Sequence, residues 1–309
     1  FDHSILVLSG HGNIFYGCMI DYNGDILTPK EIRLALESVA DIQKFEIMVL
    51  QACYEGFFEM CYELRDCVKY LIGSPMAIRQ SEETANYAKY LLNYTALCKW
   101  FEGEISIEQF IVEHLRKLVS LSWMTMMNKK VEVSLCVKLT VDSNNNGVRD
   151  IVEIANYLDE LARYYINNWN QNKQILHHKY TLIERIISVA NEQEAESPGG
   201  TNNNSRVDSG ARSHAGSVYY KWYGIIPSIF SHLYSEKISK VEQLINAIVI
   251  NDNEQGDPAD HFGVYLPLIE SKKLTDIYRY PKSIDDYAEN GSYYMTFCQN
   301  THWDEFLNK

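Results

Sequence analysis

A histidine and a cysteine, each just beyond a short apolar run, are the residues of this sequence best suited to chemistry. The first run, Ser4–Ser9, is followed by His11, and the second, Phe45–Gln51, is followed by Cys53. Side by side, an imidazole and a thiol form a general base and a nucleophile. The alternative is that Cys53 is a small core residue and His11 an ordinary loop residue, because free cysteine is among the most buried residue types.

The two apolar runs predict buried parallel strands that bring these side chains to one place. Both are short, aliphatic and followed by turn or helix signals. Between them, Thr28–Glu31 is a capping box with proline at the first helical position, so we expect a helix with an apolar face of Ile32, Leu36 and Val39. This order predicts an α/β fold, in which ligands bind beyond the carboxyl ends of parallel strands.

Composition and charge restrict the class of protein. The chain has 309 residues, 46% of them hydrophobic, and a net charge of -13. These values are typical of a globular protein and argue against a nucleic-acid partner, because phosphate binding requires a basic face. No apolar run is long enough to span a membrane. The seven cysteines show neither a disulfide pattern nor a CxxC pair, so a structural zinc site is not expected.

The rest of the chain predicts mainly helices. We expect helices at Phe57–Arg65, Glu82–Leu92, Tyr94–Phe101, Ser106–Leu118, Ile151–Trp169, Tyr180–Gln193, Ser228–Tyr234 and Lys240–Ile250, and strands at Val68–Ile72, Val131–Val141 and Phe262–Leu266. The composition of residues 194–216 predicts an exposed mobile loop, in which Arg206 and Arg212 are candidate sites of zymogen processing. The alternative is a passive surface insertion.

Several segments resemble the clostripain family of the caspase-like cysteine peptidases. They are the strand ending in His11-Gly12, the strand ending in Ala52-Cys53, the connecting segment Asp25–Leu36, and two later stretches, Phe262–Pro267 and Thr301–Leu307. The resemblance implies a caspase-like sheet, mostly parallel, with helices on both faces and a helical C-terminal extension. We expect a catalytic core over residues 1–130 and a C-terminal subdomain over 131–309 that completes the fold.

The resemblance also implies a reaction. Cys53 would be the nucleophile, His11 the general base, and the N–H groups of Gly12 and Cys53 the oxyanion hole of a cysteine endopeptidase. The alternative is a non-catalytic caspase-like interaction module. Relatives carry strands before the histidine strand, so we expect an N-terminal fragment of the same precursor as a partner. Relatives are often secreted or periplasmic bacterial proteins, whereas seven unpatterned cysteines favour the cytoplasm.

The substrate preference depends on the residue two positions before the cysteine. In clostripain relatives an aspartate there helps to bind a basic P1 side chain, but this chain has Gln51. The same Gln-Ala-Cys sequence begins the caspase motif, which implies an acidic P1 residue. Glu82 or Glu83 are candidates to bind a basic P1 side chain, and Arg79 an acidic one; the alternative for each is a solvated helix-end charge, which such residues are more often.

A separate stretch matches the pattern of a calcium-binding loop. Oxygen ligands fall at the required spacing, with Gly147 at the turn: Asp142, Asn144, Asn146, the Val148 carbonyl, Asp150 and Glu153. The alternative is an Asn-rich turn with Asp150 near a helix N-terminus. The sequence therefore predicts Ca²⁺ as a possible ligand and no other cofactor.

Overall fold

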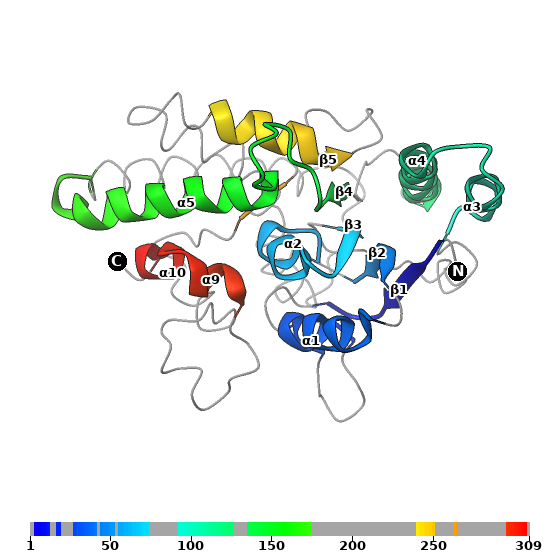
Figure 1. Cartoon of the computed structure of the whole chain (residues 1–309), viewed down its shortest axis with the longest axis horizontal. Coiled ribbons are helices and arrows are strands. Elements are labelled where there is room, and N and C mark those ends of the chain that lie inside the picture. Colours follow the sequence, from blue (N-terminus) through cyan, green and yellow to red (C-terminus); the bar gives the residue numbers. More distant parts are fainter. Residues whose placement is uncertain are drawn as a thin grey trace, which may run out of the picture.

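The fold is a five-stranded mixed sheet covered by helices, seen here in a computed structural model (Figure 1). The structure describes residues 3–12, 17–19, 27–41, 44–52, 55–74, 92–125, 135–172, 174, 239–250, 262–264 and 295–307. The strands lie in the order β1 (Ile5–Ser9), β2 (Phe45–Gln51), β3 (Val68–Gly73), β4 (Leu135–Lys138) and β5 (Val249–Ile250). The first three are parallel, and β4 and β5 are each antiparallel to the strand before. The predicted α/β class is confirmed.

The helix that connects β1 to β2 forms as its capping box predicts. In α1 (Pro29–Val39), the Thr28 Oγ1 accepts a hydrogen bond from the Glu31 N–H at 3.2 Å, and the Thr28 N–H donates to the Glu31 carboxylate at 2.9 Å. Ile32 and Leu36 are buried, as expected. Val39 is not part of the buried face, because the helix ends there and leaves its side chain 36% exposed.

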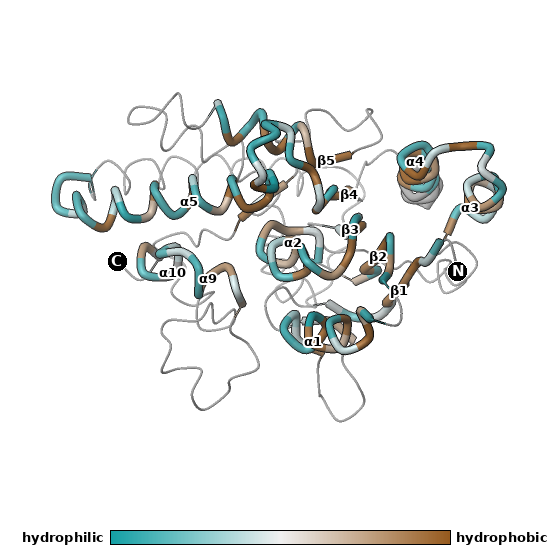
Figure 2. The backbone as a smooth tube through the Cα atoms, viewed as in Figure 1, coloured by the Kyte–Doolittle hydropathy of each residue, from teal (hydrophilic) through white to brown (hydrophobic). Residues whose placement is uncertain are grey.

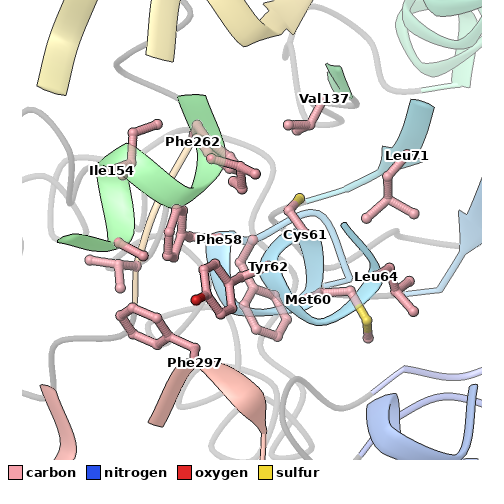
Figure 3. Packing of buried hydrophobic residues seen from close by; sticks show 14 of the residues in the cluster. Phe58, Met60, Cys61, Tyr62, Leu64, Leu71, Val137, Ile154, Phe262 and Phe297 are labelled. Atoms are coloured by element: carbon pink, nitrogen blue, oxygen red, sulfur yellow. The ribbon is translucent and has the colours of Figure 1, made fainter. Parts of the chain in front are cut away.

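Helices cover both faces of the sheet. On one face, α1, α2 (Phe58–Leu64), α5 (Asp150–Asn167) and the helix at 239–248 share a large apolar cluster with the C-terminal helices α9 (Thr296–Asn300) and α10 (Trp303–Leu307). Figure 3 shows part of this cluster, where the Phe58 ring lies 5.1 Å from the Phe297 ring. On the other face lie α3 (Tyr94–Phe101) and α4 (Ile107–Thr125). Figure 2 shows alternating hydrophobic and hydrophilic residues along α5, as expected for a helix with one buried side.

Three sequence-based expectations are wrong in detail. The first strand is only half-buried, because β1 lies at the edge of the described sheet. The helix expected through Ile250 ends at residue 248, and the next two residues pair with β4 as β5. Phe262–Val264 forms no strand; instead the Gly263 carbonyl accepts a hydrogen bond from the Phe58 N–H at 2.9 Å and caps the start of α2.

Some expected elements fall outside the described residues, namely the helix at Glu82–Leu92 except for its last residue, the helices at Tyr180–Gln193 and Ser228–Tyr234, and the loop at 194–216. Within the described chain, none of the helices has the length and apolar character that crossing a membrane requires.

Candidate active site

The two segments that carry His11 and Cys53 leave the sheet at the same edge. Ser9 of β1 is the parallel partner of Gln51 of β2, so both strands end at one level. Just beyond them, the Gly10 N–H donates to the Gln51 carbonyl oxygen at 3.2 Å. His11 follows and is exposed. Cys53 lies outside the described residues, and its described neighbours Ala52 and Glu55 are both buried.

A short hairpin fixes the backbone on either side of His11. The His11 carbonyl accepts a hydrogen bond from the Met19 N–H at 2.8 Å, and Gly12 pairs with Cys18 in an antiparallel bridge. Cys18 in turn exchanges two hydrogen bonds with Leu27, of 3.0 and 2.9 Å. Because Leu27 directly precedes the N-cap of α1, the start of that helix anchors the segment that carries His11.

The same pairing determines the direction of the Gly12 N–H. The hydrogen bond between His11 and Met19 flanks the Gly12–Cys18 pair, so this pair is of the non-hydrogen-bonded type, and the Gly12 N–H points away from Cys18. The Gly12 N–H is therefore not used in the pairing with Cys18.

The chain just after Cys53 packs tightly against the end of β3. The Gly56 N–H donates to the Ser74 carbonyl at 2.9 Å. A Cβ atom on Gly56 would lie 2.7 Å from the Gly73 carbonyl carbon, and one on Gly73 would lie 2.9 Å from the Glu55 carbonyl oxygen. Both positions require glycine for this close approach of backbone to backbone, which fixes the chain at Glu55 and Gly56, just after Cys53 in the sequence.

Burial keeps four other cysteines in the thiol form. Cys18, although next to the His11 segment, is fully buried, and desolvation followed by the nearby Glu55 carboxylate raises its pKa to about 12. Burial also raises the pKa of Cys67, to about 11, and the pKa values of Cys61 and Cys136. Since the thiolate is the nucleophile, the raised pKa values disfavour the reactive form of these side chains at neutral pH.

Among the residues predicted to bind substrate, only Gln51 is described. It is half-buried at the end of β2, beside the His11 segment. Arg79, Glu82 and Glu83 lie outside the described residues. The sequence analysis did not single out Glu55, a fully buried residue two positions after Cys53, whose carboxylate raises the pKa of Cys18. Its closeness to Cys53 in the sequence is the feature that could have indicated it.

The predicted calcium loop lies at the end of the strands opposite to the His11 segment. Leu135 at the start of β4 pairs with Gly73, near the site. Lys138 at the end of β4 pairs with Tyr70, so the chain leaves β4 at the end where β3 begins. The loop from Asp142 to Glu153 follows there. Within the described residues, no group of three or more His, Cys, Asp and Glu side chains has the arrangement of a metal site.

Comparison with known proteins gives a family match. The model of the clostripain family matches residues 1–309, in agreement with the resemblance of the His11 and Cys53 segments. The comparison with curated proteins finds no match.

Similar solved structures include a B. fragilis cysteine protease, with 14% identity, a TM-score of 0.47, and coverage of 92% of this chain and 98% of that one. A secreted C11 cysteine protease from Bacteroides thetaiotaomicron, in complex with an irreversible peptide inhibitor, has 17% identity and a TM-score of 0.38, covering 52% of this chain and 44% of that one. An inactive zymogen C11 protease from Parabacteroides distasonis has 19% identity and a TM-score of 0.33, covering 52% and 38%. The match thus spans less than half of the last two proteins.

Proposed function

The chain belongs to the clostripain family, and we propose that it is a cysteine endopeptidase with Cys53 as nucleophile and His11 as general base. The observation that carries the proposal is the register of Ser9 with Gln51, which makes the segments of both residues leave the sheet at one edge. Cys18, the described cysteine closest in the chain to His11, is a poor alternative nucleophile, because burial raises the pKa of its thiol.

In this proposal the residues act in a fixed order. The imidazole of His11 takes the proton of the Cys53 thiol, and the thiolate attacks the carbonyl carbon of the substrate peptide. The N–H groups of Gly12 and Cys53 donate hydrogen bonds to the resulting oxyanion, and the Gly12 N–H, which is not used in the pairing with Cys18, supports this role. His11 then protonates the leaving amine, and water hydrolyses the thioester to release the acid and restore the thiol.

We assign Gln51 to the P1 pocket, because it is half-buried at the end of β2, two residues before Cys53. An amide carries no charge, so it does not by itself select a basic or an acidic P1 side chain. We propose Arg79, Glu82 and Glu83 as partners for a charged P1 side chain.

We also propose that calcium binds in the loop from Asp142 to Glu153 and takes no part in breaking the peptide bond.

The test is labelling of the full chain with a thiol-reactive peptidyl probe, together with hydrolysis of a P1-varied peptide library. Wild-type protein should be labelled at Cys53, and both Cys53→Ala and His11→Ala should lose hydrolysis by at least about a thousandfold. Cys98→Ala, which removes an exposed thiol, is the matched control and should behave as wild type. Absence of labelling at Cys53, with Cys53→Ala as active as wild type, would leave the interaction module as the better explanation.

A further inference from the structure

One side of α3 carries an apolar stripe that is open to solvent. Tyr94 and Phe101 are 55% and 51% exposed, more than any other large hydrophobic side chain of the described residues. Between them lie Cys98, which is exposed, and Leu97, which is half-buried. Residues three and four positions apart are neighbours on a helix, so these four side chains form one surface, which we call the α3 stripe. Trp100, on the other side of the helix, is buried against the sheet.

Phe101 is held in place although half of its side chain is exposed. Its ring is stacked on the His3 ring, with centroids 5.8 Å apart and planes 4° from parallel, and lies 5.1 Å from the Trp100 ring. His3 is fixed in turn by its Nδ1, 2.8 Å from the Glu46 carboxylate. A side chain that is already fixed loses little conformational entropy when a partner packs on it. Phe101 is therefore suited to be the aromatic anchor of an interface.

The charges at the ends of α3 are arranged against its own dipole. The first turn has no acidic residue, whereas the exposed Glu102 and Glu104 follow the last turn. A helix carries partial positive charge at its N-terminus and partial negative charge at its C-terminus, so both carboxylates lie at the unfavourable end. Lys99 in the last turn offsets only one of them. A second helix running antiparallel along α3 would bring its positive N-terminus to these carboxylates.

The α3 stripe also matches a second copy of itself. Its two aromatic residues stand at its ends, and Leu97 and Cys98 stand at its centre. If two copies of α3 pack antiparallel about a two-fold axis between positions 97 and 98, Tyr94 of each copy meets Phe101 of the other. Interfaces with two-fold symmetry require a surface that is complementary to itself, and paired aromatic rings add to the energy of burial. Glu102 of each copy then lies beside the N-terminus of the other α3.

We propose that two copies of this chain form a dimer through their α3 stripes, packed antiparallel about a two-fold axis. Figure 1 shows α3 at the outer margin of the described fold, away from α1, α5 and the C-terminal helices, which stay uncovered in such a dimer. An eight-residue helix gives a small interface. We therefore expect weak association, with a dissociation constant of about 10–100 μM.

The first test is sedimentation equilibrium of the full chain carrying Cys53→Ala, so that the result does not depend on peptidase activity. From about 1 to 500 μM, a range that spans the expected dissociation constant, the mass should rise from that of a monomer towards that of a dimer. Tyr94→Asp and Phe101→Asp should each raise the dissociation constant at least about tenfold, because each change acts twice in a symmetric dimer. Leu34→Asp, which changes a 47% exposed side chain on α1, is the matched control and should associate as the parent protein does.

The second test uses Cys98, which the two-fold axis places close to its copy in the other chain. Positions 97 and 98 flank the axis, so the two thiols are offset by only about 1.5 Å along the helices. Cys98 is exposed. In the Cys53→Ala protein, a short bis-maleimide should therefore link two chains through Cys98. Cys98→Ser should abolish the covalent dimer, and Tyr94→Asp should reduce its yield at least about tenfold.

The two tests together decide the proposal. A monomer at every concentration, without cross-linking through Cys98, would overturn it. Association that is equally strong in Tyr94→Asp and Phe101→Asp would also overturn it, because another surface would then join the chains. All substituted side chains on α3 are exposed, so the variants should fold, and circular dichroism checks this.

Discussion

The N–H of Gly10 donates a hydrogen bond to the carbonyl oxygen of Gln51 across a distance of 3.2 Å. This bond continues the β1–β2 ladder one step beyond the last paired residues, Ser9 and Gln51. It brings the His11 segment against the residue that stands two positions before Cys53. The proposed base, nucleophile and P1 residue thus depend on one parallel strand pair.

Replacing Gln51 by aspartate should shift the P1 preference towards basic residues. The new carboxylate would lie at the same half-buried strand end, where it attracts Arg or Lys and repels Asp or Glu. We expect kcat/KM for a P1-Arg peptide relative to a P1-Glu peptide to rise at least about tenfold, which corresponds to 1.4 kcal/mol. Gln51→Asn is the control for the loss of glutamine. Equal ratios in all three proteins would exclude Gln51 from the P1 pocket.

Gly56→Ala should lower the stability of the fold. Its Cβ would lie 2.7 Å from the Gly73 carbonyl carbon, and backbone cannot move aside as a side chain can. We expect a loss of about 2–3 kcal/mol in the free energy of unfolding, measured with urea. Gly10→Ala is the comparison, because its Cβ would meet the Sδ of Met19 at 2.8 Å, a flexible side chain that can rotate. A smaller loss in Gly56→Ala than in Gly10→Ala would contradict this account.

Glu63→Ala should strongly destabilise the attachment of the C-terminal segment. The fully buried Glu63 carboxylate binds the Arg33 guanidinium at 2.7 Å and accepts from the N–H and Oγ1 of Thr296 at 2.6 and 2.9 Å. Its removal leaves Arg33 and Thr296 without this acceptor, at a cost of about 3–5 kcal/mol. Glu37→Ala removes the other, 45% exposed partner of Arg33 and should cost at most about 0.5 kcal/mol. Urea unfolding measures both; similar losses would refute the distinction.

His114 should make stability fall in mild acid. It is fully buried on α4, and desolvation, followed by the charge of Lys117, lowers its pKa from 6.5 to about 4. The folded protein therefore binds this proton more weakly than the unfolded chain does, so the stability that His114 permits above pH 6.5 is lost as the pH falls towards 4. The difference amounts to about 2 kcal/mol between pH 7 and pH 5.

The comparison for this pH effect is His114→Leu, which has no proton to bind at that position. Its free energy of unfolding, measured with urea at both pH values, should decrease by about 2 kcal/mol less than that of the wild type. An equal decrease in the two proteins would show that His114 does not carry the effect. The Phe110 ring stacks against His114 with centroids 6.1 Å apart, so the neutral imidazole fits the apolar surroundings that leucine would also occupy.

The sequence predicted well those features that depend on neighbouring residues. The capping box placed the start of α1, and Tyr94–Phe101 forms a helix with the predicted ends. The apolar runs predicted β2 and β3, and the order strand–helix–strand predicted that β1 and β2 are parallel. The assignment to the clostripain family also came from short local segments around His11 and Cys53. Hydrogen bonds within a turn and alternation along a strand involve residues close in the chain, so local sequence is sufficient for them.

Only the tertiary structure decided the features that join distant parts of the chain. Phe262–Val264 caps α2 instead of forming a strand, because the Phe58 N–H finds its acceptor in Gly263. The buried Glu63 binds Thr296, more than two hundred residues away. The antiparallel direction of β4 places the loop from Asp142 to Glu153 at the end of the strands opposite to the His11 segment. Such contacts depend on which distant segments pack together in the folded chain, and local sequence patterns do not predict this packing.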